Sequence, residues 1–331
     1  MKNKEMIALT SSELGYLWTG YSINEMSIWY LKTFYEHAED QEIKELFSFA
    51  IEIAQKLLIK RKELLSKEGY PLPAGFSKSD MNPTAPMIFT DRFFLSYLLN
   101  GSRLGAEFHI RALFFSTRAD VINYHKSCIT DVIQLNDRVV NLMLNKGVYW
   151  RTPTLPAPTS QEKIHKPSYL DGWLGDTRPL NSMEMANLYV IVELLILIET
   201  ICIGFAQTTT SAEISDIFLK GRNIAKEHYH SLYDMLSDDD LPIPPSYTAE
   251  LTDSKTRVFS DRMMICHLAG LFGSLISQYG FALGSVMKHD LLKEYSTQIS
   301  KSGIFAEKLT KLLIQKEWLE KVPGAITRKD A

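Results

Sequence analysis

Carboxylate and imidazole side chains at helical spacing are the residues of this sequence best suited to chemistry. Glu227 and His230 form a Glu-x-x-His pair of the kind that holds metal ions in helical proteins. The nearly continuous apolar stretch 187–206 carries two further carboxylates, Glu193 and Glu199. A buried carboxylate must be paired, neutralised or bound to a metal, because a lone buried charge is very unfavourable. The chemistry therefore depends on which of these groups the helices bury.

Composition narrows the classes of function. The chain has 331 residues, enough for about two domains. Its formal net charge is -3, and it lacks a basic stripe interleaved with aromatic residues, so no nucleic-acid binding is expected. Cys128, Cys202 and Cys266 are far apart, which argues against a disulfide framework and fits a reducing compartment. The first residues lack the apolar core of a signal peptide, so a cytoplasmic location is expected.

The chain contains a long internal repeat. The segment "LTSSELGYLW" from Leu9 matches "LNSMEMANLY" from Leu180, an offset of 171 residues. One residue is then lost, and "IFTDRFF" from Ile88 matches "VFSDRMM" from Val258 at an offset of 170. The repeated unit has the size of a domain, not of a solenoid motif. The sequence therefore predicts two copies of one fold.

Each copy has the apolar periodicity of four long helices. The predicted helices span 10–38, 40–68, 91–117 and 119–147 in the first copy, and 180–208, 211–238, 260–287 and 289–320 in the second. In each copy a long connection separates the second helix from the third, as in ferritin-like proteins. We therefore expect an all-α chain of two tandem ferritin-like four-helix bundles. Their predicted bounds are 1–148 and 180–331, with a stiff proline-rich linker at 149–179.

The apolar stretch 187–206 is predicted to be a buried helix and not a membrane span. Its counterpart in the first copy, 16–35, carries polar residues such as Asn24 and Lys32 and would insert poorly. Glu193 and Glu199 would each disfavour insertion by roughly 2.5–3.5 kcal/mol near the bilayer centre. A helix that is apolar on nearly all sides is usually buried on nearly all sides.

Comparison of the two copies identifies polar residues at core positions of the second. Glu199 stands where the first copy has Ile28, and His228 stands where it has Leu57. His267 lies at the edge of the buried face. One glutamate and two histidines could form a mononuclear metal site, with Glu199, His228 and His267 as ligands. The favoured alternative is a hydrogen-bonded Glu–His pair with a structural role, with Gln278 and Tyr295 nearby.

Two other polar groups are weaker candidates. The helical phase of Glu227 and His230 points away from the core, so we expect an exposed pair, and they rank second as metal ligands. In the first copy Asn24, His109 and His125 fall at core positions and are expected to be satisfied structural residues.

Small residues recur along the seventh predicted helix at Gly270, Gly273, Ser277, Gly280 and Gly284. Glycine in a helix interior costs about 1 kcal/mol relative to alanine, so this stripe needs a reason. We favour close packing within one bundle over an oligomer or interdomain seam.

Several segments together resemble a known family. They are "FTDRFFLSYLLNGSRLGAEF", "LNKGVYWRTP", "FSDRMMICHLAGLFGSLISQYGFAL", "LIQKEWLEKVP" and the paired loops "PLPAGF" and "PIPPSY". The chain is similar here to domain-of-unknown-function family 3231 of spore-forming bacteria. The resemblance implies tandem ferritin-like bundles and spore-coat-like proteins. It implies no established activity and no accepted catalytic residues.

These observations favour a non-enzymatic structural or interaction protein, linked to sporulation or stress. The expected partners are further copies of the chain or a spore-associated protein, and no cofactor is expected. One alternative is a protein that binds a divalent metal (Fe, Mn or Zn), or an oxidase that depends on it, through the buried Glu/His cluster of the second bundle. Another alternative is a carrier of a small apolar ligand.

Overall fold

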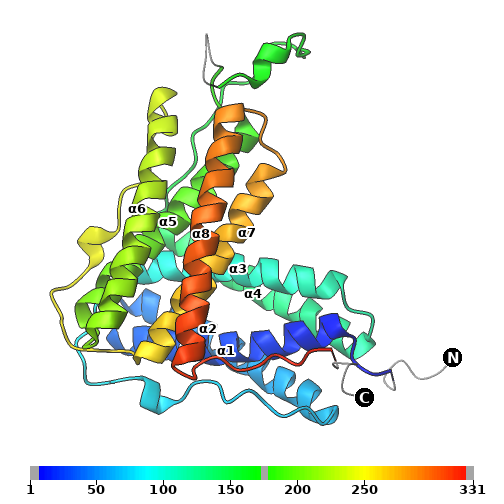
Figure 1. The fold of residues 1–331 in the computed structure, drawn as a ribbon, viewed down its shortest axis with the longest axis vertical. Helices are drawn as coiled ribbons and strands as arrows, with labels where there is room; N and C mark the ends of the chain where they lie inside the picture. Colours follow the sequence, from blue (N-terminus) through cyan, green and yellow to red (C-terminus); the bar gives the residue numbers. More distant parts are fainter. Residues whose placement is uncertain (1–6, 173–177, 326–331) are drawn as a thin grey trace. The chain divides into compact units, whose positions relative to one another are not determined.

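The computed structural model describes residues 7–172 and 178–325, and over these residues the chain is all-helical (Figure 1). Eight α-helices and no β-strand occur within the described ranges. The prediction of an all-α chain with eight long helices is therefore confirmed. By its internal contacts the chain divides into two compact units, which are described separately.

Unit 1 contains the four helices of the first repeat: α1 (Ser11–His37), α2 (Gln41–Lys67), α3 (Asp91–Phe114) and α4 (Ala119–Asn145). Helix α1 pairs with α2 and α3 pairs with α4, while α2 also packs on α4 and α1 on α3. Their apolar faces supply the core, in which Phe34 stacks on Phe94 with ring centroids 4.6 Å apart.

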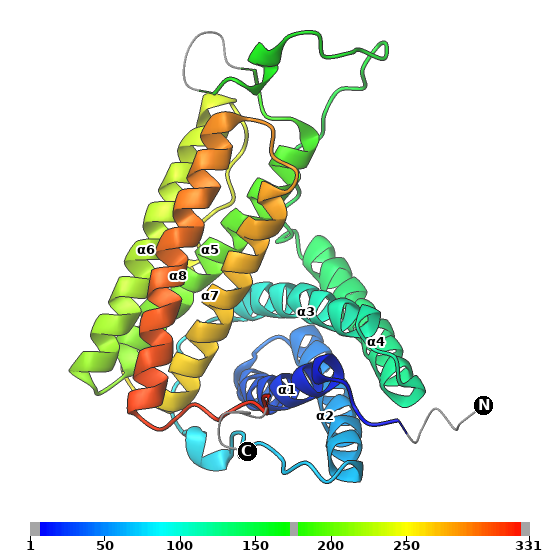
Figure 2. The ribbon, with the colours of Figure 1, turned by 45° about the vertical axis from the view of Figure 1, so that its right-hand side comes forward.

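Unit 2 contains most of the second repeat: α5 (Ser182–Thr208), α6 (Ala212–Asp238), α7 (Asp261–Leu283) and α8 (His289–Gln315). Helix α5 packs on α6, and α6 packs on α8. Phe272 and Phe305 join α7 to α8, with ring centroids 4.6 Å apart. The four helices run side by side in both views (Figures 1 and 2).

Unit 1 also takes in residues from the second repeat, namely Val258–Met263 and residues 316–325. Phe259 packs against Tyr30 with ring centroids 4.3 Å apart, and Ser260 Oγ donates to Asp80 Oδ1 at 2.7 Å. A short segment of the second repeat is thus part of the first unit's core. The predicted domain bounds 1–148 and 180–331, with the linker 149–179, stay a prediction. Residues 173–177 of that linker lie outside the described ranges.

A glutamate at the equivalent position anchors the first helix of each unit. Glu13 follows the N-cap of α1, is 1% exposed, and accepts from the backbone N–H groups of Thr117 and Arg118 at 2.7 and 2.8 Å. Glu184 holds the matching place in α5 and accepts from Met287 N and Lys288 N at 3.0 and 3.1 Å. Each carboxylate satisfies backbone donors that the start of a helix leaves free, and it ties the junction of the last two helices to the start of the first.

Helix α5 is long and apolar enough to cross a membrane by length and composition. However, 83% of its most apolar window is buried within the described structure, as in a core helix of a globular protein. The structure therefore gives no clear membrane span, in agreement with the sequence-based expectation.

The expectation of close packing along the glycine stripe is wrong for three of its members. A Cβ added at Gly270, Gly273 or Gly280 would meet no described atom within 4 Å. These glycines therefore do not bring two backbones together within the described structure. At Gly284, just beyond the end of α7, the nearest atom is the carbonyl oxygen of Phe281 at 3.3 Å.

Candidate metal centre

Two histidines and a cysteine meet in the core of unit 1. His109 on α3 and His125 and Cys128 on α4 each offer one ligand atom, and these atoms all lie within 4.8 Å of one another. His109 Nδ1 and His125 Nδ1 are 3.0 Å apart. The exposed fractions are 5% for His109 and 0% for the other two residues. We call these three residues the His–His–Cys cluster.

Helix geometry explains the cluster. His125 and Cys128 are three residues apart, which places both side chains on the same face of α4. Helix α3 pairs closely with α4, and it brings His109 to that face. The positions flanking the cluster on α4, Val121 and Val132, are buried and apolar. The cluster therefore lies in a dry part of the core.

Burial keeps both imidazoles neutral. Burial, together with the nearby charges of Arg61 and His125, lowers the pKa of His109 to about 2. Burial and Arg61 lower the pKa of His125 to about 4. Neutral imidazole is the form that binds metal ions. His125 Nε2 is buried and has no hydrogen-bond partner in the described part of the chain, so it has an unused lone pair or N–H.

The cysteine is a protonated thiol in this structure. Burial raises the pKa of Cys128 to about 12, although the Tyr124 hydroxyl and Arg61 act in the opposite direction. A thiol with so high a pKa is unreactive as a nucleophile. A metal ion reverses this situation, since a coordinating thiol is deprotonated outright. The three groups together form a nitrogen and sulfur donor set of the kind that binds soft transition metals.

Arg61 is the fourth polar residue of this core and is 2% exposed. Its guanidinium donates to the carbonyl oxygen of Gly20 and to Asn24 Oδ1. A side chain at Gly20 would collide with the guanidinium, since the nearest approach of an added Cβ would be 2.5 Å. The guanidinium also lies over the ring of Tyr124, 5.5 Å from its centroid.

The sequence-predicted ligands of the second repeat lie in unit 2 and are not brought together in this way. Glu199, His228 and His267 do not form a group like the His–His–Cys cluster among the described residues. Glu199 is half-buried, and burial raises its pKa, while Lys226, His230 and Arg222 act to lower it. Glu199 therefore lies near the polar side of α6, and the structure gives it no hydrogen bond to His228.

His228 is 1% exposed, and its Nδ1 is 3.1 Å from Tyr279 Oη. Burial lowers its pKa to about 4. His267 is also buried, its pKa is lowered to about 3 by burial, and its ring meets Phe205 edge-on. His228 is thus bonded to a tyrosine, and not to the glutamate that the sequence suggested.

The second-ranked pair, Glu227 and His230, is exposed, as its helical phase predicts. Glu227 is exposed and forms an ion pair with Lys301 at 2.5 Å, and His230 is exposed. In the first unit, Asn24 is satisfied by donating to Ala54 O at 2.8 Å. Neither position gathers several ligand atoms.

Sequence reasoning identified His109 and His125 as core residues but missed Cys128. The cysteine was read as one of three distant thiols, and its spacing of three from His125 was the signal that could have found it. The contact to His109 was not visible, because it depends on the pairing of α3 with α4.

The repeat offset relates the cluster to a polar core in unit 2. His109, His125 and Cys128 correspond to Tyr279, Tyr295 and Gln298. Tyr279 and Tyr295 are stacked at a tilt, with centroids 5.7 Å apart. Tyr295 Oη and Gln298 Oε1 are buried, and among the described residues they have no hydrogen-bond partner. Both units thus have a polar core at the same place. In unit 2 it holds His228 beside Tyr279, and within the described residues three clustered metal-binding side chains occur in unit 1.

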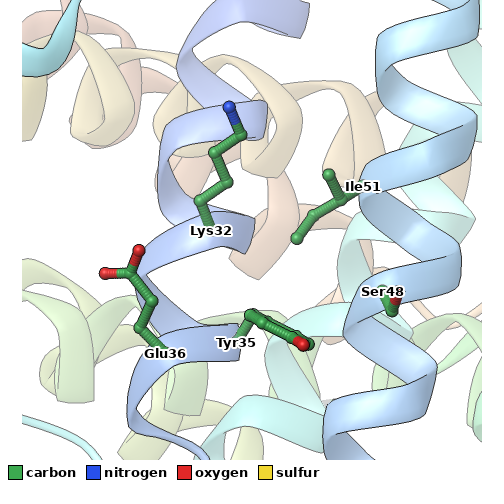
Figure 3. A pocket seen from close by; sticks show the side chains of 5 residues that line it. All are labelled: Lys32, Tyr35, Glu36, Ser48 and Ile51. Carbon is green, nitrogen blue, oxygen red and sulfur yellow. The ribbon is translucent and has the colours of Figure 1, made fainter.

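A surface pocket lies between α1 and α2 (Figure 3). It is lined by Lys32, Tyr35 and Glu36 from α1 and by Ser48 and Ile51 from α2. The side chains in Figure 3 do not converge on a common point. The pocket therefore offers no constellation for catalysis.

Comparisons with known proteins agree with the repeat. A family model described as "Protein of unknown function (DUF3231)" matches residues 1–160 and again residues 168–330. No curated protein sequence matches the chain. One solved structure, a candidate spore coat protein from Bacillus halodurans, is similar with 23% identity and a TM-score of 0.43. It covers 47% of this chain and 100% of its own length.

Proposed function

The chain belongs to the DUF3231 family of proteins of unknown function, and from this starting point we propose that it is a metal-binding protein. The ion is held in unit 1 by His109, His125 and Cys128. One observation carries the proposal: three buried donor atoms from two helices lie within 4.8 Å of one another. His109 Nδ1 and His125 Nδ1 are within hydrogen-bond distance of each other, and His125 Nε2 is a buried nitrogen without a partner in the described part of the chain, which a bound ion would satisfy.

The proposal includes a ferritin-like arrangement of each unit, in which four helices enclose a polar site within an apolar core. It assigns the bound ion a structural or storage role, in a protein that works inside the cell or its spore. The family match supports the tandem arrangement, and the burial of the cluster supports a role without turnover.

Metal analysis of the full chain tests this function. The protein is purified without chelator and without metal-affinity resin, and its transition metals are measured by mass spectrometry. We expect one ion per chain after loading, and we expect Cys128→Ala and His125→Ala each to lose it. A chain that takes up no transition metal on titration would reject the proposed function.

Two variants control for unspecific effects. Cys202 is a second fully buried cysteine that lies on α5 in unit 2, so Cys202→Ala should keep the ion. His228→Ala tests the site suggested by the sequence alone. Loss of the ion in His228→Ala but not in Cys128→Ala would move the site to unit 2.

A second candidate function is association with other proteins, including further copies of this chain. It is favoured by Phe114 and Phe115 at the C-terminal end of α3, which are 79% and 62% exposed. Adjacent exposed aromatic residues are typical of interaction surfaces. If they form one, Phe114→Ser with Phe115→Ser should lower the mass measured by light scattering. An unchanged mass in the double variant would remove this surface from consideration.

A further inference from the structure

The charge around the His–His–Cys cluster indicates which ion it takes. Arg61 is buried, and arginine stays protonated in proteins. No carboxylate forms an ion pair with it in the described part of the chain, and its contacts there are with neutral groups. The core of unit 1 therefore contains a guanidinium that no described carboxylate contacts directly, while the Glu13 carboxylate acts on the pKa of His125 in the direction opposite to Arg61.

Arg61 lies close to the cluster. Its guanidinium carbon is 5.5 Å from the ring centroid of Tyr124. That ring centroid is in turn 4.9 Å from the ring centroid of His125 and 6.2 Å from that of His109. Tyr124 thus lies between the guanidinium and the two imidazoles. The Arg61 charge lowers the pKa values of His109, His125 and Cys128, because little water screens it in this buried site.

The charge balance differs between ions. When Cys128 binds a metal, its S–H bond breaks, a metal–sulfur bond forms and the proton leaves to solvent. A monovalent ion with one thiolate and two neutral imidazoles has no net charge. A divalent ion in the same site leaves a charge of about +1 beside Arg61, and two like charges in a dry core are unfavourable.

The number and type of ligands favour the same ion. Zinc in closed protein sites is almost always four-coordinate, and the cluster supplies three donors. Thiolate is a soft ligand that selects copper(I), and imidazole also suits copper. Iron(II) and manganese(II) prefer donor sets richer in oxygen, which the cluster lacks.

Resting on the proposed function, we infer that the ion bound by His109, His125 and Cys128 is copper(I), and that Arg61 selects it over divalent metals. Copper arrives already reduced, so no electron is transferred. One ion enters and one proton leaves. An added Cβ at Gly20 would come within 2.5 Å of the Arg61 guanidinium, so a substitution there is expected to displace this group.

The test is a competition experiment on the full chain under anaerobic conditions. Copper(I) is supplied as its coloured complex with bicinchoninate, whose absorbance falls as the protein withdraws copper, and Zn²⁺ is titrated separately. We expect the protein to withdraw one equivalent of copper(I), and we expect equimolar Zn²⁺ not to displace it. Zn²⁺ displacing copper(I) would overturn the inference and leave metal binding intact, whereas uptake of neither ion would overturn both.

Variants of Arg61 test the selection itself. Arg61→Met removes the charge with similar bulk and should raise the affinity for Zn²⁺ relative to copper(I) by about tenfold or more. Arg61→Lys keeps a positive charge and should keep the preference. Gly20→Ala is a second variant, in which the added methyl group displaces the guanidinium of Arg61. Circular dichroism checks that each variant is folded before it is titrated. An affinity ratio that stays unchanged in folded Arg61→Met and Gly20→Ala would overturn the role of Arg61.

Discussion

At the scale of single residues, the buried histidines make this protein sensitive to acid. His228 has a pKa near 4 in the folded chain, against an ordinary value of 6.5, because it is buried. The unfolded chain therefore takes up this proton more readily than the folded chain. The part of the unfolding free energy that is linked to neutral His228 is fully present above pH 6.5 and is lost as the pH falls towards 4.

Replacing His228 by leucine, the residue of the first repeat at this position, should remove its share of the acid sensitivity. In the parent protein, the His228 contribution should lower the unfolding free energy by roughly 2 kcal/mol when the pH falls from 7 to 5. At pH 7 the variant should be less stable by about 1 kcal/mol, because Tyr279 loses its hydrogen-bond partner. Urea unfolding at both pH values measures the two effects.

His230→Leu is the matched control for this measurement, since His230 is exposed on the same helix. It should leave the stability at pH 7 unchanged, because replacing an exposed side chain removes no buried contact. If His228→Leu and the parent protein lose the same free energy between pH 7 and pH 5, His228 already binds its proton in the folded chain.

Residue patterns predicted part of the candidate site. Helical phase placed His109, His125 and His228 in cores, since an apolar stripe is visible in sequence. It could not show that His109 meets Cys128, because that contact crosses from α3 to α4. It also could not foresee that Glu199 stays half-buried, since long side chains carry their charge towards water from a buried backbone.

At the scale of elements, each unit depends on a carboxylate that joins helices distant in sequence. Glu184 is 1% exposed. Its carboxylate accepts from the Arg178 guanidinium and from three backbone N–H groups, those of Asn181, Met287 and Lys288. Burial alone would raise its pKa, but the Arg178 ion pair and the backbone N–H groups lower it to about 2. The carboxylate thus stabilises the fold only while it is charged.

Glu184→Gln should destabilise unit 2 by about 3 kcal/mol at pH 7, from the difference between the folded and ordinary pKa values. In the parent protein this contribution is present above pH 4.5 and is lost as the pH falls towards 2. Thermal unfolding at pH 7 and pH 3 should therefore show a large difference between variant and parent at pH 7 and a smaller one at pH 3. Glu213→Gln, at an exposed glutamate in the first turn of α6, should have little effect.

The helices themselves were largely predictable, because their apolar periodicity and N-caps are local. Thr10 and Asn181 cap α1 and α5 through capping boxes that the sequence spells out. The predicted C-terminal ends were too long for α7 and α8, which stop at Leu283 and Gln315. C-terminal ends are set by backbone conformations such as the positive φ of 56° at Glu317, and these leave a weaker mark on sequence when the residue is not glycine.

At the scale of the whole molecule, the boundaries of the sequence repeat do not coincide with the boundaries of the two structural units. Phe259 corresponds to Phe89 in the first repeat, and both are 3% exposed or less. Phe89 stacks on Phe93, with ring centroids 4.0 Å apart, while Phe259 packs against Tyr30. Both phenylalanines thus belong to unit 1. Periodicity shows that a residue is buried, but it does not show in which core.

This arrangement predicts that a residue of the second repeat stabilises the first unit. Phe259→Ala should lower the unfolding free energy of unit 1 by about 3–5 kcal/mol, because a large buried ring leaves a cavity beside Tyr30. Hydrogen exchange followed by mass spectrometry should show faster exchange in peptides of α1. Peptides of α6, which belongs to unit 2, should change less.

Phe281→Ala is the matched control, since Phe281 also lies in the second repeat but is 69% exposed. It should leave exchange in α1 unchanged, because truncating an exposed ring opens no cavity. A fragment ending at residue 149 should resemble the Phe259→Ala variant, since it lacks the same ring and the Ser260–Asp80 hydrogen bond. If α1 exchanges equally slowly in the parent, in Phe259→Ala and in the fragment, the first repeat is stable without Phe259, and the segment 258–263 is an accessory to its core.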